Sequence, residues 1–499
     1  MQIEFLKNEI RCLQEQAVDV IYQEETAEFI VPDVYPDAAK VVEVSAICCQ
    51  REQEMHSGSM TVSGTFHATV LFLAEESEEV CVQDVFLPYS VRLSADEIPD
   101  NAFGQAEVRI RSADARIINS RKLMVRVSYA ARLSVYTPSM LCIRSYEGNG
   151  KVQVLQTDEL QYVAIAAAEK TMTFSESIQL PEQNAPLRRV IRVRPSLHQR
   201  EQRLTEGRAV WQGSLELSIL CLLDNGQVSR SAVELPVAQY LDLDIDSDEG
   251  MLRILPVLTD FRLEEDASGT YLLSAGIRFQ AMVWGSIPVT MILDGYCIGA
   301  EFKPEFEPAV LRSWIAEPKE NVMAESAMRE MPHKPVDCAV WVDFPVCRRG
   351  EKEISVGTVV NAQALCYDEN GTLFGETART EVSCSFPAGK DTVCYADADA
   401  TGHAVFRPSE KKIQSSVDIS VRCVEEKKLQ TIIAAQTEQK EGKQEDLPSL
   451  IVRRISGETT LWDVAKKAGT TVQAIQDANS LDGDTLQNGM LLLIPAAME

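Results

Sequence analysis

The stretch TVSGTFHATVLFL, residues 61–73, decides the fold class because polar and apolar side chains alternate along it. Val62, Phe66 and Val70 would lie on one face of an extended chain, and Thr65 and His67 would lie on the other. Residues 215–221 repeat the alternation with Leu, Leu, Ile and Cys. A period of two over these lengths predicts half-buried β-strands.

The same region shows that the chain repeats itself. Gln-Arg-Glu-Gln occurs at residues 50–53 and again at 199–202, and a shift of 149 residues superimposes the flanking sequence without a gap. Residues 357–371 form a weaker third copy whose register slips by one. A period of this length is the size of a domain. We therefore expect three related β-rich domains, at residues 1–149, 150–300 and 301–433.

Turn signals support this fold class. Asp224–Gly226 and Asp368–Gly371 place Asn and Gly after an alternating stretch, which predicts a β-hairpin. Many short alternating strands favour a β-sandwich or a partly open barrel in each unit. We expect a mainly β protein with three tandem β-sandwich-like domains, and helices in them only near residues 5–23 and 157–170.

Composition limits the partners. The chain has 499 residues and a formal charge of −27, which disfavours nucleic acid or an anionic membrane because both need clustered Lys and Arg. The first residues do not resemble a secretory signal, and no run of about 18 apolar residues could cross a bilayer. We expect a cytoplasmic protein whose thirteen scattered cysteines are mostly reduced and buried.

No motif for catalysis, a metal or a cofactor stands out. Five histidines are widely spaced, and no Gly-x-Ser-x-Gly elbow is present. Residues 242–250, DLDIDSDEG, imitate the start of a calcium loop, but Ser247 stands where the turn needs Gly and Arg253 where the loop needs Glu. We expect an acidic-faced strand there, no metal site, no cofactor and no enzymatic activity.

The C-terminal part differs from the repeats. Residues 434–448 are polar and charged without apolar periodicity, which predicts a linker. Residues 449–499 then predict a strand, two helices and a final strand. Leu461, Val464 and Ala465 share a face of the first helix, Gly469 ends it, and "TTVQAIQDAN" begins a second helix with a capping Thr.

This order of elements, with Gly457, Trp462, Asn479 and Gly489 at the matching places, resembles the lysin-motif (LysM) family. The resemblance implies a groove for polymers containing N-acetylglucosamine, such as peptidoglycan. By position, the groove residues would be those of two loops: Gly457, Glu458, Thr459, Thr460, Asn479, Ser480 and Leu481. An extra residue in the first loop, relative to the family's Gly-Asp-Thr-Leu-Trp, leaves either a glycan or a protein as the ligand.

The whole chain resembles a family of spore-coat morphogenetic proteins, in which β-rich repeats precede a C-terminal lysin motif. The stretch EFIVPDVYPDAAKVVEVSA, residues 28–46, carries that resemblance. It implies a scaffold in the mother-cell cytoplasm, recruited to the forespore surface by a coat morphogenetic ATPase and associated with other coat proteins. The alternative is a cell-wall protein that binds peptidoglycan or another N-acetylglucosamine polymer outside the membrane.

Overall fold

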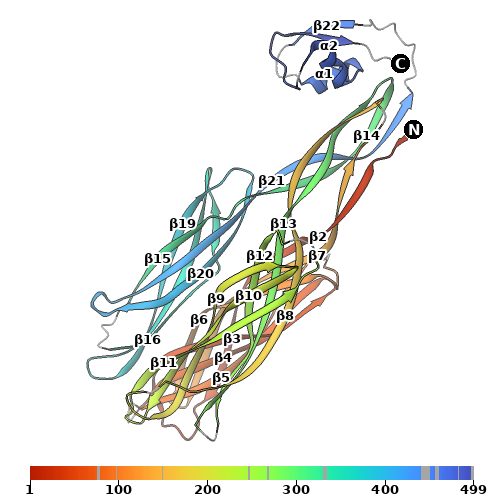
Figure 1. Ribbon diagram of the computed structural model, residues 1–499. Helices are drawn as coiled ribbons and strands as arrows, with labels where there is room; N and C mark the ends of the chain where they lie inside the picture. The colour runs from red at the N-terminus through yellow and green to blue at the C-terminus, as the bar shows by residue number, and fades with distance from the viewer. Residues whose placement is uncertain are drawn as a thin grey trace.

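The computed structural model confirms a mainly β protein with a small α+β domain at the C-terminus (Figure 1). It describes residues 1–75, 79–96, 98–148, 150–181, 183–245, 248–266, 269–329, 334–439, 450–455, 460–481 and 483–495. The long strands fall into three consecutive sets, which we call units 1, 2 and 3. Each unit packs two antiparallel sheets face to face around an apolar core.

Unit 1 contains six long strands in two sheets. One sheet has the order β3 (Ala38–His56), β4 (Ser59–Ala74), β5 (Val80–Ser94), and the other has β2 (Leu6–Ile30), β7 (Lys122–Ser145), β6 (Phe103–Asn119). Phe66 from the first sheet packs against Tyr129 from the second, with ring centroids 4.8 Å apart. The inward-facing side chains predicted from residues 61–73 therefore form the core of this sandwich.

Unit 2 repeats this arrangement. Its sheets are β9 (Leu187–Thr205), β10 (Arg208–Leu223), β11 (Val228–Asp242) and β8 (Val152–Ile178), β13 (Tyr271–Cys297), β12 (Met251–Glu265). The predicted turn at Asp224–Gly226 is confirmed, with Gly226 at a φ of 78°. The single pairing of Leu13 with Ala164 joins the second sheets of units 1 and 2.

Unit 3 has the same plan, with two of its strands interrupted. One sheet contains β16 (Lys334–Val342), β17 (Val346–Arg349), β18 (Glu353–Tyr367) and β19 (Leu373–Pro387). The other contains β14 (Ala300–Ala316), β15 (Lys319–Ala327), β20 (Thr392–Arg407) and β21 (Lys412–Gln439), to which β1 (Gln2–Ile3) adds; the 3-10 turn η1 (Pro408–Glu410) connects β20 to β21. The predicted hairpin at Asp368–Gly371 is confirmed.

The C-terminal domain consists of β22 (Leu450–Arg454), α1 (Leu461–Ala468), α2 (Val472–Asn479) and β23 (Leu491–Pro495), with the two strands antiparallel. This is the predicted order of elements. In Figure 1 the domain lies beyond the far ends of β13, β14 and β21, which extend out of the sandwiches toward it.

Three local predictions were wrong. The expected helices at residues 5–23 and 157–170 are strands β2 and β8, because their backbones pair along their length with β7 and β13. The expected linker begins too early: β21 continues to Gln439, with Ile432 and Ala435 buried against Ile3 and Ile292. Residues 440–448 lie outside the described residues. The expected acidic-faced strand at residues 242–250 is not found among the described residues of that range: β11 ends at Asp242, opposite Arg208, where β10 begins, and residues 246 and 247 lie outside the described residues.

Equivalent positions of the three units meet in one shared core. The alternation predicts that residues 61–73 are buried on one face only. This prediction is wrong at Leu71 and Leu73, because their side chains are buried on the face opposite the unit 1 core. Four sets of equivalent residues, one from each unit, form this inter-unit core: Val42, Ile191 and Val336; Leu71, Leu220 and Leu365; Leu73, Leu222 and Tyr367; Val80, Val228 and Leu373. The units are thus arranged with approximate threefold symmetry around this core.

A buried ionic triad lies beside the inter-unit core. Its members, Glu43, Arg192 and Asp337, also occupy equivalent positions in the three units, and the Arg192 guanidinium donates to both carboxylates. Their side chains are 1%, 1% and 2% exposed. Arg194 and Arg230 approach Asp337 at 3.2 and 3.1 Å. Three buried side chains of the same charge would repel one another at these positions. The junction is possible because a basic residue stands between two acidic ones.

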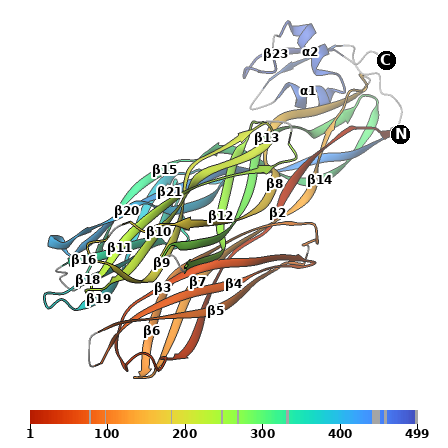
Figure 2. The same cartoon turned by 60° about the horizontal axis from the view of Figure 1, so that its bottom comes forward.

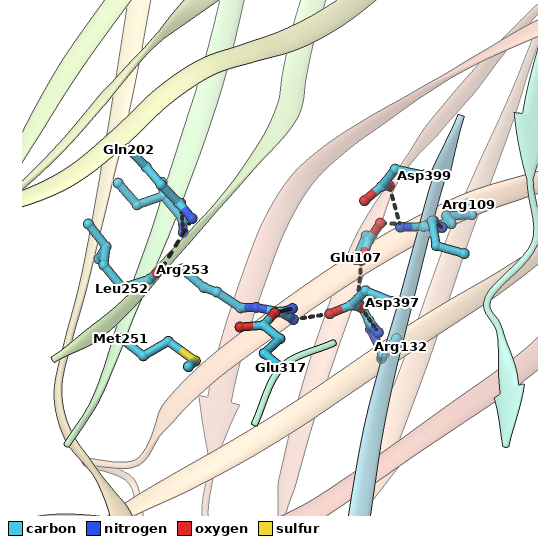
Figure 3. Close-up of polar contacts among 12 residues, drawn as sticks. Glu107, Arg109, Arg132, Gln202, Met251, Leu252, Arg253, Glu317, Asp397 and Asp399 are labelled. Atoms are coloured by element: carbon cyan, nitrogen blue, oxygen red, sulfur yellow. Dashed lines mark hydrogen bonds and ion pairs between the residues drawn. The ribbon is translucent and has the colours of Figure 1, made fainter. Parts of the chain in front are cut away.

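A second polar cluster links the units further along (Figure 3). The Asp397 carboxylate of unit 3 forms an ion pair with Arg132 of unit 1 at 2.5 Å and a second ion pair with Arg253 of unit 2. Arg253 in turn donates to Glu317 of unit 3 at 2.9 Å, and Arg132 donates to Glu107 at 2.7 Å. Charge-assisted contacts of this kind fix geometry, so the three units form one interlocked body.

Candidate functional site

Helix α1 of the C-terminal domain is defined by its caps. The Thr460 hydroxyl accepts from the Asp463 backbone N–H at 3.1 Å, and the Asp463 carboxylate accepts from the Thr460 N–H, which forms a capping box. Gly469 ends the helix with a φ of 67°. Leu461, Val464 and Ala465 are buried, as the apolar periodicity predicted.

Helix α2 is fixed to the sheet by one side chain. The Asn479 amide donates to the carbonyls of Ile475 and Leu493, at 2.7 and 2.6 Å, and its oxygen accepts from the Leu493 N–H at 2.8 Å. Ser480 then adopts the left-handed conformation, with φ at 51°. Asn479 therefore holds α2 against β23.

The strand-helix-helix-strand order and these caps can be compared with known families. Residues 455–495 match the LysM domain. No curated protein and no solved structure matches the chain. The match covers the C-terminal domain.

The predicted groove residues of the LysM domain are only partly described. Gly457, Glu458 and Thr459 lie outside the described residues. Thr460 uses its hydroxyl in the α1 cap, and the Asn479 amide is engaged with the backbone of the domain. Ser480 is exposed, and Leu481 is half-buried against the LysM core. Ser480 and Leu481 therefore form the part of the predicted groove with side chains that a ligand can reach.

A contact that the sequence did not predict joins the LysM domain to unit 2. The Trp462 indole N–H donates to the Asp294 carboxylate at 2.8 Å, and the Lys466 ammonium contacts both oxygens of that carboxylate at 2.7 Å. The Tyr296 hydroxyl donates to the Thr470 carbonyl at 2.7 Å in a buried position. We call these five residues the LysM latch.

Aromatic packing completes the latch. The rings of Tyr296 and Trp462 lie edge to face, with centroids 5.0 Å apart. Tyr296 is 5% exposed and belongs to the same apolar cluster as Leu461 and Ile475. Figure 2 shows α1 next to the end of β13, which carries Asp294 and Tyr296. The LysM domain is therefore packed on unit 2 in addition to being connected by the chain.

The latch depends on an irregularity in β13. The register between β13 and β8 shifts between Ile292 and Asp294, which is typical of a β-bulge. A bulge changes the direction in which the following side chains point, and here Asp294 and Tyr296 both face the LysM domain. Sequence periodicity could not predict this contact, because the two segments are about 170 residues apart and the bulge has no fixed sequence signature.

The electrostatics of the latch favour an ionised Asp294. Burial alone would raise the pKa of this carboxyl group, but hydrogen bonds from Lys466, Trp462 and the Gly295 N–H outweigh burial and lower its pKa below the ordinary value. The ionised carboxylate is the form that accepts all three donors. The latch is therefore complete at neutral pH.

Metal-binding groups, membrane-spanning helices and thiols are the other features to consider in the described part of the chain. No group of three or more His, Cys, Asp and Glu side chains is placed there to hold a metal ion. No helix in the described ranges is long and apolar enough to span a bilayer. All thirteen cysteines are free, and Cys347 is the exposed one. The chemistry that the described site supports is binding, through hydrogen bonds and apolar contact at Ser480, Leu481 and their surroundings.

Proposed function

We propose that the protein is a non-enzymatic scaffold in which the three interlocked β-units carry the LysM domain in a fixed orientation and the LysM domain binds the ligand. The observation that carries this proposal is the LysM latch, because it holds the binding domain against a body whose units are themselves joined by the buried ionic triad. A rigid support of this kind suits the positioning of a partner.

The LysM domain suggests binding to peptidoglycan or another N-acetylglucosamine polymer. Our finer proposal concerns the setting: the order of units resembles SipL, a spore-coat morphogenetic protein, and we place the chain at the forespore surface in the mother-cell cytoplasm. There it would dock through the LysM domain onto a coat morphogenetic ATPase and help to assemble other coat proteins. The acidic chain, with its formal charge of −27, favours partners with basic surfaces.

The test compares two matched variants of the full-length chain. Leu481→Lys places a charge in the predicted groove, while the aliphatic part of the new side chain can still cover the LysM core. Leu160→Lys makes the same change at an exposed site of unit 2, where Leu160 is 56% exposed. We expect Leu481→Lys to lose binding to the purified coat ATPase and Leu160→Lys to retain it. Equal binding by both variants would remove the groove from the proposal.

The second candidate is a cell-wall protein that binds peptidoglycan, and the LysM match itself favours it. The same two variants distinguish the candidates when soluble N-acetylglucosamine oligomers replace the ATPase. Binding of oligomers alone, together with recovery of the native protein in the vegetative wall or culture supernatant, would support the cell-wall protein. Recovery with sporulating mother cells would support the scaffold.

A further inference from the structure

Unit 2 contains a cavity at one end of its sandwich. Its volume is about 660 Å³, which lies in the usual range for ligand sites. The cavity opens at the end of the sandwich where the segment between β8 and β9 crosses toward the start of β13. Cys221 and Tyr271 line its buried floor, and Gln179, Gln183 and Asn184 are among its other lining residues, with the Gln183 amide bonded to Pro181 and Ser229.

In unit 1 an aromatic pair fills the equivalent space. The half-buried Tyr35 ring lies edge to face on Phe72, with centroids 6.1 Å apart. Its hydroxyl accepts from Arg189 at 3.0 Å. The shift of 149 residues that superimposes the two units places Asn184 at the position of Tyr35 and Cys221 at the position of Phe72. Both aromatic side chains are therefore replaced by small ones in unit 2.

The third difference concerns the segment between β8 and β9 in unit 2, which lacks an arginine contact that holds the same segment of unit 1. In unit 1, Arg121 donates to the Tyr35 carbonyl at 2.7 Å and to the Val31 carbonyl at 2.9 Å. Phe29 pairs with Leu123 in unit 1 and Ile178 pairs with Tyr271 in unit 2, so Arg121 corresponds to Gly269. The larger Tyr271 in place of Leu123 does not close the space, because the cavity remains beside it.

We propose that this cavity of unit 2 is a binding site for a neutral aromatic side chain, of the tyrosine type, from a partner polypeptide. Unit 1 supplies the argument for the occupant, since the same recess of the same fold holds a tyrosine ring there. Among the described residues, the lining of the cavity includes amides, prolines and apolar side chains and no charged group. An uncharged ring with one hydroxyl matches an apolar floor with amide hydrogen-bonding groups. This inference is independent of the LysM groove.

The experiment uses the full-length chain and two small probes, p-cresol and N-acetyltyrosinamide, with N-acetylalaninamide as the control compound. Ligand-observed NMR is expected to show saturable binding of both aromatic probes, in the roughly millimolar range typical of such small ligands, and none of the control compound. The variant Cys221→Phe/Asn184→Tyr restores the unit 1 pair in unit 2. It should weaken probe binding by roughly tenfold or more, because the added rings occupy the cavity.

The matched control is Asn370→Tyr, which adds a tyrosine at an exposed turn of unit 3 and should leave binding unchanged. Undiminished binding by the filled variant would overturn the proposal, as would the absence of aromatic binding in the wild-type protein. If the filled variant does not fold, p-iodophenol soaked into wild-type crystals decides the question. An iodine peak between Cys221 and Tyr271 supports the site, and a peak elsewhere or no peak overturns it.

Discussion

Replacing Arg192 by Leu should be the most damaging single charge deletion among the contacts between units. The Arg192 guanidinium is the direct partner of both Glu43 and Asp337, and all three side chains are almost completely buried. Removing it leaves Glu43 with one remaining partner, Arg194 at 3.5 Å. Asp337 keeps Arg194 and Arg230. The uncompensated charge is therefore concentrated on Glu43.

The expected loss follows from the cost of an unpaired buried charge. Removing one member of a buried ion pair destabilises a protein by about 3 to 5 kcal/mol, whereas an exposed pair contributes about 0 to 1 kcal/mol. The control is Arg200→Leu, because Arg200 pairs with Glu234 on the surface, where their side chains are 67% and 54% exposed. The assay is urea denaturation of the full-length chain, with the free energy of unfolding compared between variants.

A double variant separates pairing from packing. Glu43→Leu/Arg192→Leu removes the carboxylate that Arg192→Leu leaves uncompensated, while Asp337 keeps Arg194 and Arg230. Apolar replacement of both members of a buried ion pair is often neutral or stabilising. We expect it to recover most of the stability lost by Arg192→Leu. A loss below about 1 kcal/mol for Arg192→Leu, or a double variant less stable than the single one, would refute the account of the unit junction.

Three further predictions concern the latch and unit 3. Lowering the pH should release the LysM domain, and tryptophan fluorescence measures the release. Because the pKa of docked Asp294 is lowered, the contribution of its carboxylate to docking is complete above about pH 4, the pKa of a free aspartate, and declines as the pH falls through the lower docked value. Asp294→Asn should remove this acid dependence. Trp462→Ala should destabilise the LysM domain by about 3 to 5 kcal/mol, and an unchanged LysM melting transition would argue against its packing role. The Cys394 and Cys423 thiols lie 3.5 Å apart on paired strands, but burial and the neighbouring Cys423 raise the pKa of Cys394 to about 12. Oxidised glutathione should therefore form a disulfide between them only at alkaline pH, because the thiolate is the reactive form. Intact-mass measurement should detect this disulfide in the wild-type protein and not in Cys394→Ser.

Local sequence patterns predicted most of the strands and both LysM helices, but not the contacts between them. Alternation at residues 61–73 predicted the strands, and the apolar face of residues 461–465 with the stop at Gly469 predicted α1, because both signals are local. The same 149-residue shift aligns Glu43 with Arg192, but nothing in a linear alignment shows that equivalent positions meet at an approximate threefold axis. The helix prediction for β2 and β8 was wrong because the pairing with β7 and β13 that makes them strands is a long-range contact.

At the candidate site the division is similar. The LysM elements follow from apolar periodicity and caps, whereas the engagement of Asn479 with β23 depends on tertiary geometry. The latch could not be predicted, because Asp294 and Trp462 are brought together by a bulge and by the packing of two domains. The unit 2 cavity becomes visible only when the filled recess of unit 1 is available for comparison.

The most direct test of the scaffold proposal is photo-crosslinking in sporulating cells. A photoreactive phenylalanine analogue replaces Leu481 in the LysM groove of one full-length chain and Leu160 on unit 2 of another. The proposal predicts a covalent product with the coat morphogenetic ATPase from position 481 and none from position 160. The absence of that product from position 481, or its appearance from position 160 alone, would contradict recruitment through the LysM domain.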